Sequence, residues 1–171
     1  MKQIVQPEST SDKKSERNYL EVLRKIGAQG VIGPTPGERL SRLVQMVAKD
    51  LCWDVCSLYI IEEKTNELIL AATHGLKEES VGRVRLPISE GLVGNAVQKD
   101  KPIFLEYASK DPRFKYFPET EEDKYISMAA VPFSRDGKVT GVMAVQTIEP
   151  YKFTTADMHF WTFWSGRSVR R

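Results

Sequence analysis

Apolar residues in the first third of the chain recur with the spacing of amphipathic helices. Between residues 37 and 52 they fall at the i, i+3, i+4, i+7 and i+11 positions of one helical face, namely Leu40, Leu43, Val44, Val47 and Leu51. A shorter pattern of the same kind predicts a first helix from about residue 15, which Gly27 or Gly30 would end. Residues 155–164 predict a last helix that is rich in aromatic side chains.

Further along the chain, the pattern changes to the alternation and short apolar runs of β-strands. Residues 55–62 and 67–73 are two such runs joined by a polar turn at Asn66, so they predict a hairpin. A second hairpin is predicted at residues 126–148, where Asp136-Gly137 suits the positive φ angles of a type I′ turn. Both arms of this hairpin are almost continuously apolar, which is typical of central strands covered on both faces.

Shorter elements fill the interval between the two hairpins. Residues 83–88 alternate as a strand with one wet face, and a helix is predicted from Ser89. Residues 101–106 predict a short strand, and Pro132 predicts a bulge or strand end in the second hairpin. Antiparallel strands with flanking helices indicate an α+β domain with a central sheet of five or six strands.

The 171 residues are enough for one domain with a short extension. Residues 1–16 are polar without an apolar period, so we expect a disordered leader. We expect an N-terminal helix and linker over residues 17–36, one folded domain over residues 37–166, and a basic tail over residues 167–171.

Composition and charge exclude several classes of protein. No apolar run approaches the about 20 residues that span a membrane, and the N-terminus lacks the apolar core of a secretory signal. The 25 Lys and Arg are interspersed with 23 Asp and Glu, which leaves a net charge of +2 and no basic stripe for nucleic acid. We therefore expect a cytoplasmic protein that binds neither membrane nor nucleic acid.

Cysteine and histidine give no sign of a metal or catalytic centre. Cys52 and Cys56 are too few and wrongly spaced for a zinc site or a disulfide framework, so we interpret both as core residues. His74 follows a predicted strand and His159 lies in the last predicted helix, and we interpret both as structural or surface residues. No metal, cofactor or catalytic residue is predicted.

Two segments are candidates for ligand binding. In "DPRFKYFPETEEDKY", charged and aromatic residues alternate, so Arg113 could bind a ligand carboxylate while aromatic rings close an apolar pocket. The alternative is that Phe114 and Phe117 only anchor a loop whose charges are solvated. In "EGLVGNAV", Gly91 and Gly94 could let an anion approach a helix N-terminus, or could only pack the helix against the sheet.

The order and spacing of three segments resemble the GAF domain family over about residues 38–163. These segments are "LSRLVQMVAKDLCWDVCSLYI", "EGLVGNAVQKDKPIFLEYASKDPRF" and "VPFSRDGKVTGVMAV". The stretch "PRFKYFPETEEDKYISMAAVPF" is similar to GAF domains at the N-terminus of the phosphoenolpyruvate-protein phosphotransferases of the nitrogen phosphotransferase system. The chain departs from that group at Met128, Ala129 and Ala130, where the group has a large residue and then Gly.

This resemblance implies a GAF-like fold and a non-enzymatic regulatory domain that senses a small metabolite and controls a phosphotransferase absent from this chain. Glutamine and 2-oxoglutarate are the ligands that it suggests. The ligand-binding candidates are Arg113, Phe114, Tyr116, Tyr125, Ser127, Gly91 and Leu92.

The terminal helices predict a homodimer, since their apolar residues exceed what a small domain is expected to leave exposed. These residues are Trp161, Phe163, Trp164, Leu20, Leu23 and Ile26. Two alternatives stay open at this point. One is a GAF-fold reductase of free methionine sulfoxide, which would depend on Cys52 and Cys56, and the other is a ligand-free dimerisation module.

Overall fold

The structure of the protein is a computed structural model that describes residues 10–29 and 32–166. Helix α1 spans Thr10–Gln29, so it includes the last part of the segment predicted to be a disordered leader. The rest of that leader, residues 1–9, lies outside the described residues, as does the predicted basic tail.

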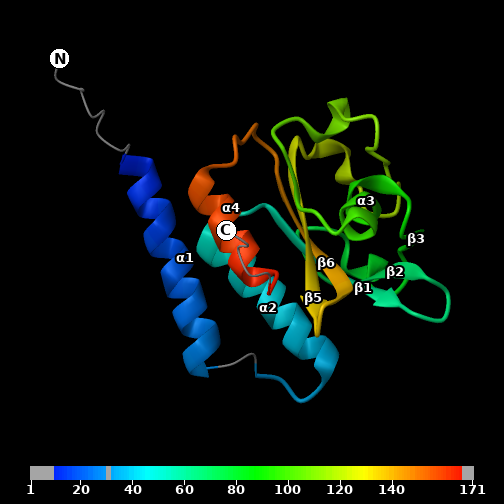
Figure 1. Ribbon diagram of the computed structural model, residues 1–171, viewed down its shortest axis with the longest axis horizontal. Coiled ribbons are helices and arrows are strands. Elements are labelled where there is room, and N and C mark those ends of the chain that lie inside the picture. The colour runs from blue at the N-terminus through cyan, green and yellow to red at the C-terminus, as the bar shows by residue number, and fades with distance from the viewer. Residues whose placement is uncertain (1–9, 30–31, 167–171) are drawn as a thin grey trace.

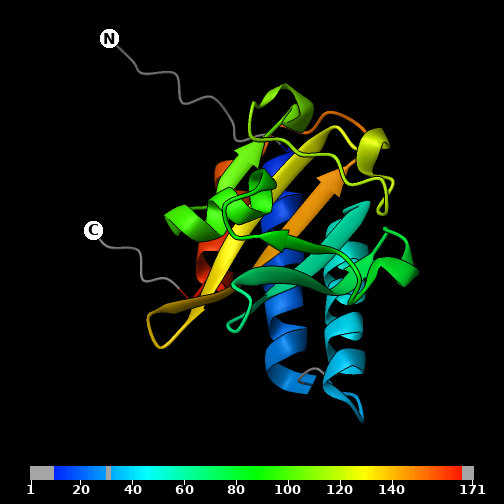
Figure 2. The same ribbon diagram turned by 90° about the vertical axis from the view of Figure 1, so that its right-hand side faces the viewer.

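The described chain is arranged in layers around one sheet (Figure 1). Helices α1, α2 (Pro36–Leu51) and α4 (Thr155–Trp164) lie together on one side of the sheet. Helix α3 (Gly91–Lys99) and the irregular segments around it lie on the other side. Figure 2 shows the sheet face on, with α1 and α2 behind it.

The sheet has six strands in the order β3-β2-β1-β6-β5-β4, and every neighbouring pair is antiparallel. The strands are β1 (Val55–Glu62), β2 (Glu67–His74), β3 (Arg85–Pro87), β4 (Ile103–Leu105), β5 (Ser127–Arg135) and β6 (Lys138–Thr147). Short 3-10 turns lie at Glu78–Ser80, Ala108–Lys110 and Glu122–Lys124. This is the α+β architecture with a central antiparallel sheet that the sequence predicted.

Local sequence signals explain where several elements begin and turn. Thr35 caps α2, because its hydroxyl accepts a hydrogen bond from the backbone N–H of Glu38 at 3.2 Å, and Pro36 fits the first helical turn. Asp136 and Gly137 have φ angles of 51° and 78°, as the predicted tight turn requires. The bulge in this hairpin falls between Phe133 and Ser134, next to Pro132.

The sheet separates two hydrophobic cores. In β5, Ala129 and Val131 face the core under α1, α2 and α4, while Met128 and Ala130 face the core under α3. This alternation is the two-residue period of a strand whose faces are both covered. The prediction of doubly covered central strands is confirmed.

The terminal helices pack on each other, which corrects part of the sequence interpretation. Trp161 is only 1% exposed and belongs to the helix-side core, whereas it was expected to be exposed. The rings of Tyr19 in α1 and Phe160 in α4 stack with their centroids 4.3 Å apart. Only Leu20 and Phe163 of the predicted exposed set are largely exposed, each at 69%.

A buried carboxylate joins these helices. Asp157 is fully buried and accepts hydrogen bonds from the hydroxyls of Tyr19 in α1 and Tyr151 before α4. It also accepts one from the backbone N–H of Thr154 at 2.6 Å, while the Thr154 hydroxyl accepts from the Asp157 N–H at 3.2 Å. This pair forms the capping box that starts α4.

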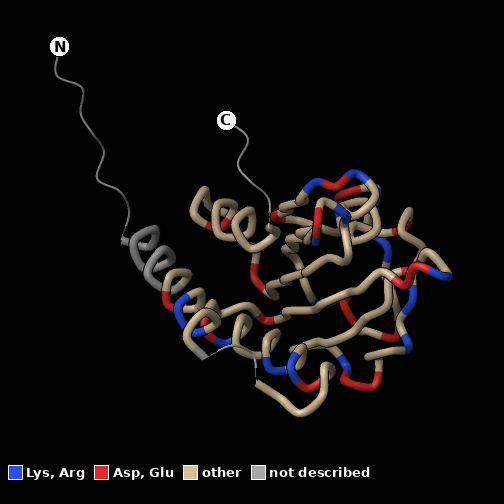
Figure 3. Tube along the Cα trace, turned by 60° about the horizontal axis from the view of Figure 1, so that its bottom comes forward, with Lys and Arg blue, Asp and Glu red and all other residues tan. Residues whose placement is uncertain are grey.

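Basic and acidic residues are interspersed along the described chain (Figure 3). Among the described helices, none has the length and hydropathy needed to cross a membrane.

Candidate functional site

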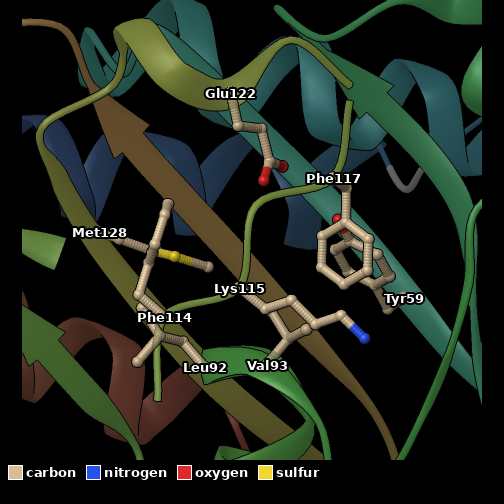
Figure 4. A pocket seen from close by; sticks show the side chains of 8 residues that line it. All are labelled: Tyr59, Leu92, Val93, Phe114, Lys115, Phe117, Glu122 and Met128. Carbon is tan, nitrogen blue, oxygen red and sulfur yellow. The ribbon is translucent and has the colours of Figure 1, made fainter. Parts of the chain in front are cut away.

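A small cavity lies on the α3 side of the sheet, under the loop between β4 and β5. Its volume is about 20 Å³, which is room for about one water molecule. Strands β1 and β5 and helix α3 form the floor and one wall, and the loop forms the remainder (Figure 4). The lining residues are Tyr59, Leu92, Val93, Phe114, Lys115, Phe117, Glu122 and Met128.

The loop packs closely over the start of α3. Phe114 and Phe117 are partly buried against the core under α3. Gly91, the first residue of α3, has a φ of 66°, and a Cβ built on it would lie 3.7 Å from the Cβ of Lys115. Gly94 lies tighter still, since its Cβ would come within 2.7 Å of the Ile88 carbonyl oxygen. This close approach agrees with the interpretation that Gly94 lets the helix pack against the neighbouring segment of the same chain.

The two basic side chains at the front of the loop are already paired. The guanidinium of Arg113 donates to both oxygens of Asp111, Nε at 2.8 Å and Nη2 at 2.7 Å. These hydrogen bonds lower the pKa of Asp111 to about 2 and raise the pKa of Arg113. Lys115 forms an ion pair with Glu90. Arg113 is thus not aimed into the cavity as a free carboxylate fork, and it is not among the lining residues.

Glu122 is the unusual group of the site. It is 7% exposed, and Figure 4 shows its carboxyl end directed toward the space between Met128 and Phe117. Burial raises the pKa of this carboxyl from 4.5 to about 7, while a hydrogen bond with Thr120 acts in the opposite direction. No cation offsets its charge within the described part of the chain. Burial, and then the charge of Glu122, raise the pKa of Tyr59 well above 10.

The structure brings some of the predicted ligand-binding residues together and separates others. Leu92 and Phe114 line the cavity, and Gly91 lies beside it, where only a Cβ built on it would reach Lys115. Tyr116 is 44% exposed and does not line the cavity. Of these two aromatic residues of the loop, only Phe114 therefore lies at the cavity.

Tyr125 and Ser127 support the loop instead of lining the cavity. The Tyr125 hydroxyl donates to the Gly75 carbonyl oxygen at 2.8 Å. The Ser127 hydroxyl donates to the Glu106 carbonyl oxygen at 2.7 Å and accepts from the backbone N–H of Tyr151, also at 2.7 Å. Both side chains are buried and fix the place where the loop returns to the sheet.

Six lining residues were not predicted from the sequence: Tyr59, Val93, Lys115, Phe117, Glu122 and Met128. Lys115 and Phe117 lie in the alternating segment and share its signal. Glu122 follows two other acids in "ETEEDK", and nothing in that run distinguishes the buried carboxyl from the exposed ones.

Neither cysteine lies at the cavity. Cys56 is buried in the helix-side core, across the sheet, and burial raises the pKa of its thiol. Cys52 is exposed, contrary to the prediction, because it ends α2 in a left-handed conformation with a φ of 57°. Among the described residues, no three His, Cys, Asp or Glu side chains gather in a way that could hold a metal ion.

The ionisation of Glu122 predicts a pH-dependent stability. The pKa of Glu122 is about 7 in the folded state and 4.5 for an unperturbed Glu. Between these pH values the folded state therefore binds more protons than the unfolded state. The free energy of unfolding should therefore fall as the pH rises through this window, by about 3 kcal/mol at most. Glu122→Gln removes the titration, so the variant should match the parent near pH 4.5 and exceed it at pH 8 in urea unfolding.

Glu119→Gln is the matched control, because Glu119 is an exposed acid of the same loop. It should follow the parent at every pH. An identical pH dependence of the parent and of Glu122→Gln would show that Glu122 is not the titrating group.

Comparison with known proteins agrees with this architecture. The family model described as GAF domain matches residues 35–164. The chain therefore belongs to the GAF domain family.

Within that family, the chain is similar to GAF domains of one kind of protein. The GAF domain from a phosphoenolpyruvate-protein phosphotransferase of Coxiella burnetii is 30% identical, with a TM-score of 0.81 over 88% of this chain and 89% of that one. A curated relative from Escherichia coli K12, "Phosphoenolpyruvate-dependent phosphotransferase system", is 34% identical over 110 residues. Those residues are 64% of this chain and only 15% of that relative. The domain is thus homologous to the GAF domain of phosphoenolpyruvate-protein phosphotransferases.

The fold also occurs in an enzyme. A free methionine-R-sulfoxide reductase from Neisseria meningitidis, solved with its substrate, has a TM-score of 0.75 and 19% identity over 97% of this chain and 92% of that one. At this identity the likeness shows a shared fold only.

Proposed function

We propose that this domain is a non-catalytic sensor in signal transduction, which binds a small metabolite in the cavity under the β4–β5 loop. Through this binding it controls a phosphoenolpyruvate-protein phosphotransferase that lies outside this chain. The proposal includes a cytoplasmic role in nitrogen regulation, which the sequence resemblance suggests, with glutamine and 2-oxoglutarate as the first ligands to test.

The buried carboxyl of Glu122 is the observation that supports this proposal most strongly. A carboxyl taken out of water without a cation destabilises the fold, and a purely structural core would be more stable with an apolar residue in its place. A cavity of about 20 Å³ cannot hold a metabolite, so residues 111–126 must move outward when a ligand binds. An irregular loop can move in this way at a lower cost than a strand of the sheet.

A chain of hydrogen bonds supports transmission from this loop to the terminal helices. Ser127, at the end of the loop, holds the backbone of Glu106 and Tyr151. The Tyr151 hydroxyl donates to Asp157 at 2.8 Å, and Asp157 also binds the Tyr19 hydroxyl. A ligand that binds the open loop more tightly than the closed one would shift this chain of contacts. In this proposal α1 and α4 carry the shift to the phosphotransferase.

The two alternatives have less support. The reductase alternative depends on cysteines near the ligand, whereas Cys56 lies across the sheet and Cys52 is exposed at the end of α2. A dimerisation module would have a core filled by side chains, and the small volume of the cavity agrees with this. However, a dimerisation module gives no reason for the buried Glu122. Replacing both cysteines with serine should leave ligand binding unchanged.

Thermal unfolding in the presence of glutamine, 2-oxoglutarate, cyclic nucleotides and methionine sulfoxide tests the sensor proposal. A ligand at 100 times its Kd should stabilise the domain by about 2.7 kcal/mol. Stabilisation by glutamine or 2-oxoglutarate alone would support the proposal. A folded sample that none of these compounds stabilises at millimolar concentration would favour the dimerisation module.

Pairing of two copies through the terminal helices also belongs to this proposal. Leu20 on α1 and Phe163 on α4 are the large apolar side chains that remain most exposed there. Sedimentation should show a dimer that Leu20→Gln combined with Phe163→Gln converts to a monomer. A monomeric parent at about 100 μM would contradict the dimer.

A further inference from the structure

We propose that the cavity takes a ligand that carries a protonated amine, and that Glu122 is the group that binds its ammonium. This inference rests on the proposed sensing function and names the chemical class that the site selects. It reverses the expectation from the sequence, in which Arg113 would bind a ligand carboxylate.

The charges around the cavity carry the inference. The guanidinium of Arg113 is held by both oxygens of Asp111, and the ammonium of Lys115 is held by Glu90. Neither of these two cations is therefore available to an anion without first losing its own partner. Glu122 is a buried acid whose carboxyl is directed into the space.

The shape and chemistry of the walls define the other end of the ligand. An ammonium group is about as large as the single water molecule for which the cavity has room. Around that point the walls are apolar, with Leu92 and Val93 on α3, Met128 on β5, and the rings of Phe114 and Phe117 on the loop. An amine with a short apolar body would place its body against these side chains after Phe114 and Phe117 move outward.

A carboxylate in the same place would be repelled by Glu122, and the binding pocket could accept it only with Glu122 protonated. The affinity for a neutral ligand would depend on the charge of Glu122 only through hydrogen bonding. The dependence of binding on pH therefore distinguishes the three classes of ligand.

Other titratable groups near Glu122 do not confuse this test. Of the residues that line the cavity, only Tyr59 on β1 and Lys115 on the loop are titratable besides Glu122. The raised pKa of Tyr59 keeps it neutral between pH 6 and pH 8. On the turn of Glu122 itself, Glu121 pairs with Lys77, while Asp123 is exposed and Lys124 lies over the Tyr125 ring.

The probes are 3-methylbutylamine, 3-methylbutanol and 3-methylbutanoate, which share one apolar body and differ in charge. Amide chemical shifts of the ¹⁵N-labelled protein would be followed during titration with each probe at millimolar concentration. The amine should bind most tightly and shift amides of α3 and of residues 111–126. Because the ionised fraction of a group with a pKa of about 7 rises about tenfold between pH 6 and pH 8, its Kd should fall by about tenfold over that range.

Glu122→Gln should weaken binding of the amine by at least about tenfold at pH 8 and remove the pH dependence. Glu119→Gln, on the same loop, should bind as the parent does. Equal or tighter binding of the alcohol or the carboxylate at these amides would overturn the amine proposal and leave the sensing function standing. If no probe and no compound of the metabolite panel shifted these amides, both proposals would be contradicted.

Discussion

Replacing Trp161 with alanine is expected to lower the free energy of unfolding by about 3–5 kcal/mol, the usual range for a large aromatic residue removed from a core. The Trp161 side chain is 1% exposed and belongs to the helix-side core, with the centroid of the Phe160 ring 4.9 Å from its own. Its indole N–H has no hydrogen-bond partner among the described residues, so the loss comes from packing alone. Urea unfolding followed by circular dichroism measures it.

Phe163→Ala is the matched control, since Phe163 lies two residues further along the same helix and is 69% exposed. It should change stability by no more than about 0.5 kcal/mol in the monomer. Equal losses for the two variants would mean that α4 does not pack as described here.

Asp157→Ala should also destabilise the domain strongly, by about 3–5 kcal/mol. The change would remove the acceptor for the hydroxyls of Tyr19 and Tyr151 and for the backbone N–H of Thr154. With the Thr154 hydroxyl, which donates to the same carboxyl at 2.8 Å, four donors would then lose a shared partner in a fully buried place, and α4 would lose its capping box. The loss is again measured by urea unfolding.

A double-mutant cycle tests whether the hydroxyls of Tyr19 and Tyr151 stabilise the domain through the same carboxyl. Tyr19→Phe and Tyr151→Phe should each cost about 1–2 kcal/mol. Because both donate to the same carboxylate, their losses should not add when combined. Additive losses would show that Asp157 does not couple α1 to the segment before α4.

The sequence predicted the parts of the fold that depend on local pattern. The apolar stripe from Leu40 to Leu51 marked α2, and the Asp136-Gly137 turn fixed the β5–β6 hairpin. The burial of Trp161 could not be predicted from local pattern, because an aromatic helix has the same sequence pattern whether α1 covers it or a second copy of the chain does. The stacking of Tyr19 on Phe160 joins residues far apart in the chain, and no periodicity signals it.

The site was less predictable for the same reason. Phe114 and Leu92 could be named because aromatic alternation and a glycine-bounded helix are local signals. Arg113 was assigned to a ligand, although Asp111 two residues before it is a competing partner that the sequence already contains. Glu122 becomes special only when the loop folds back over α3 and buries one of several acids.

The most direct test of the sensor is a titration of the ¹⁵N-labelled domain with glutamine, in which amide chemical shifts are followed at the cavity and at the terminal helices. The account predicts saturable shifts both at the cavity, in α3 and residues 111–126, and at the terminal helices around Tyr19 and Asp157. Shifts that are absent, or that stop at the loop and never reach α1 and α4, would contradict a domain that senses this metabolite and transmits the result.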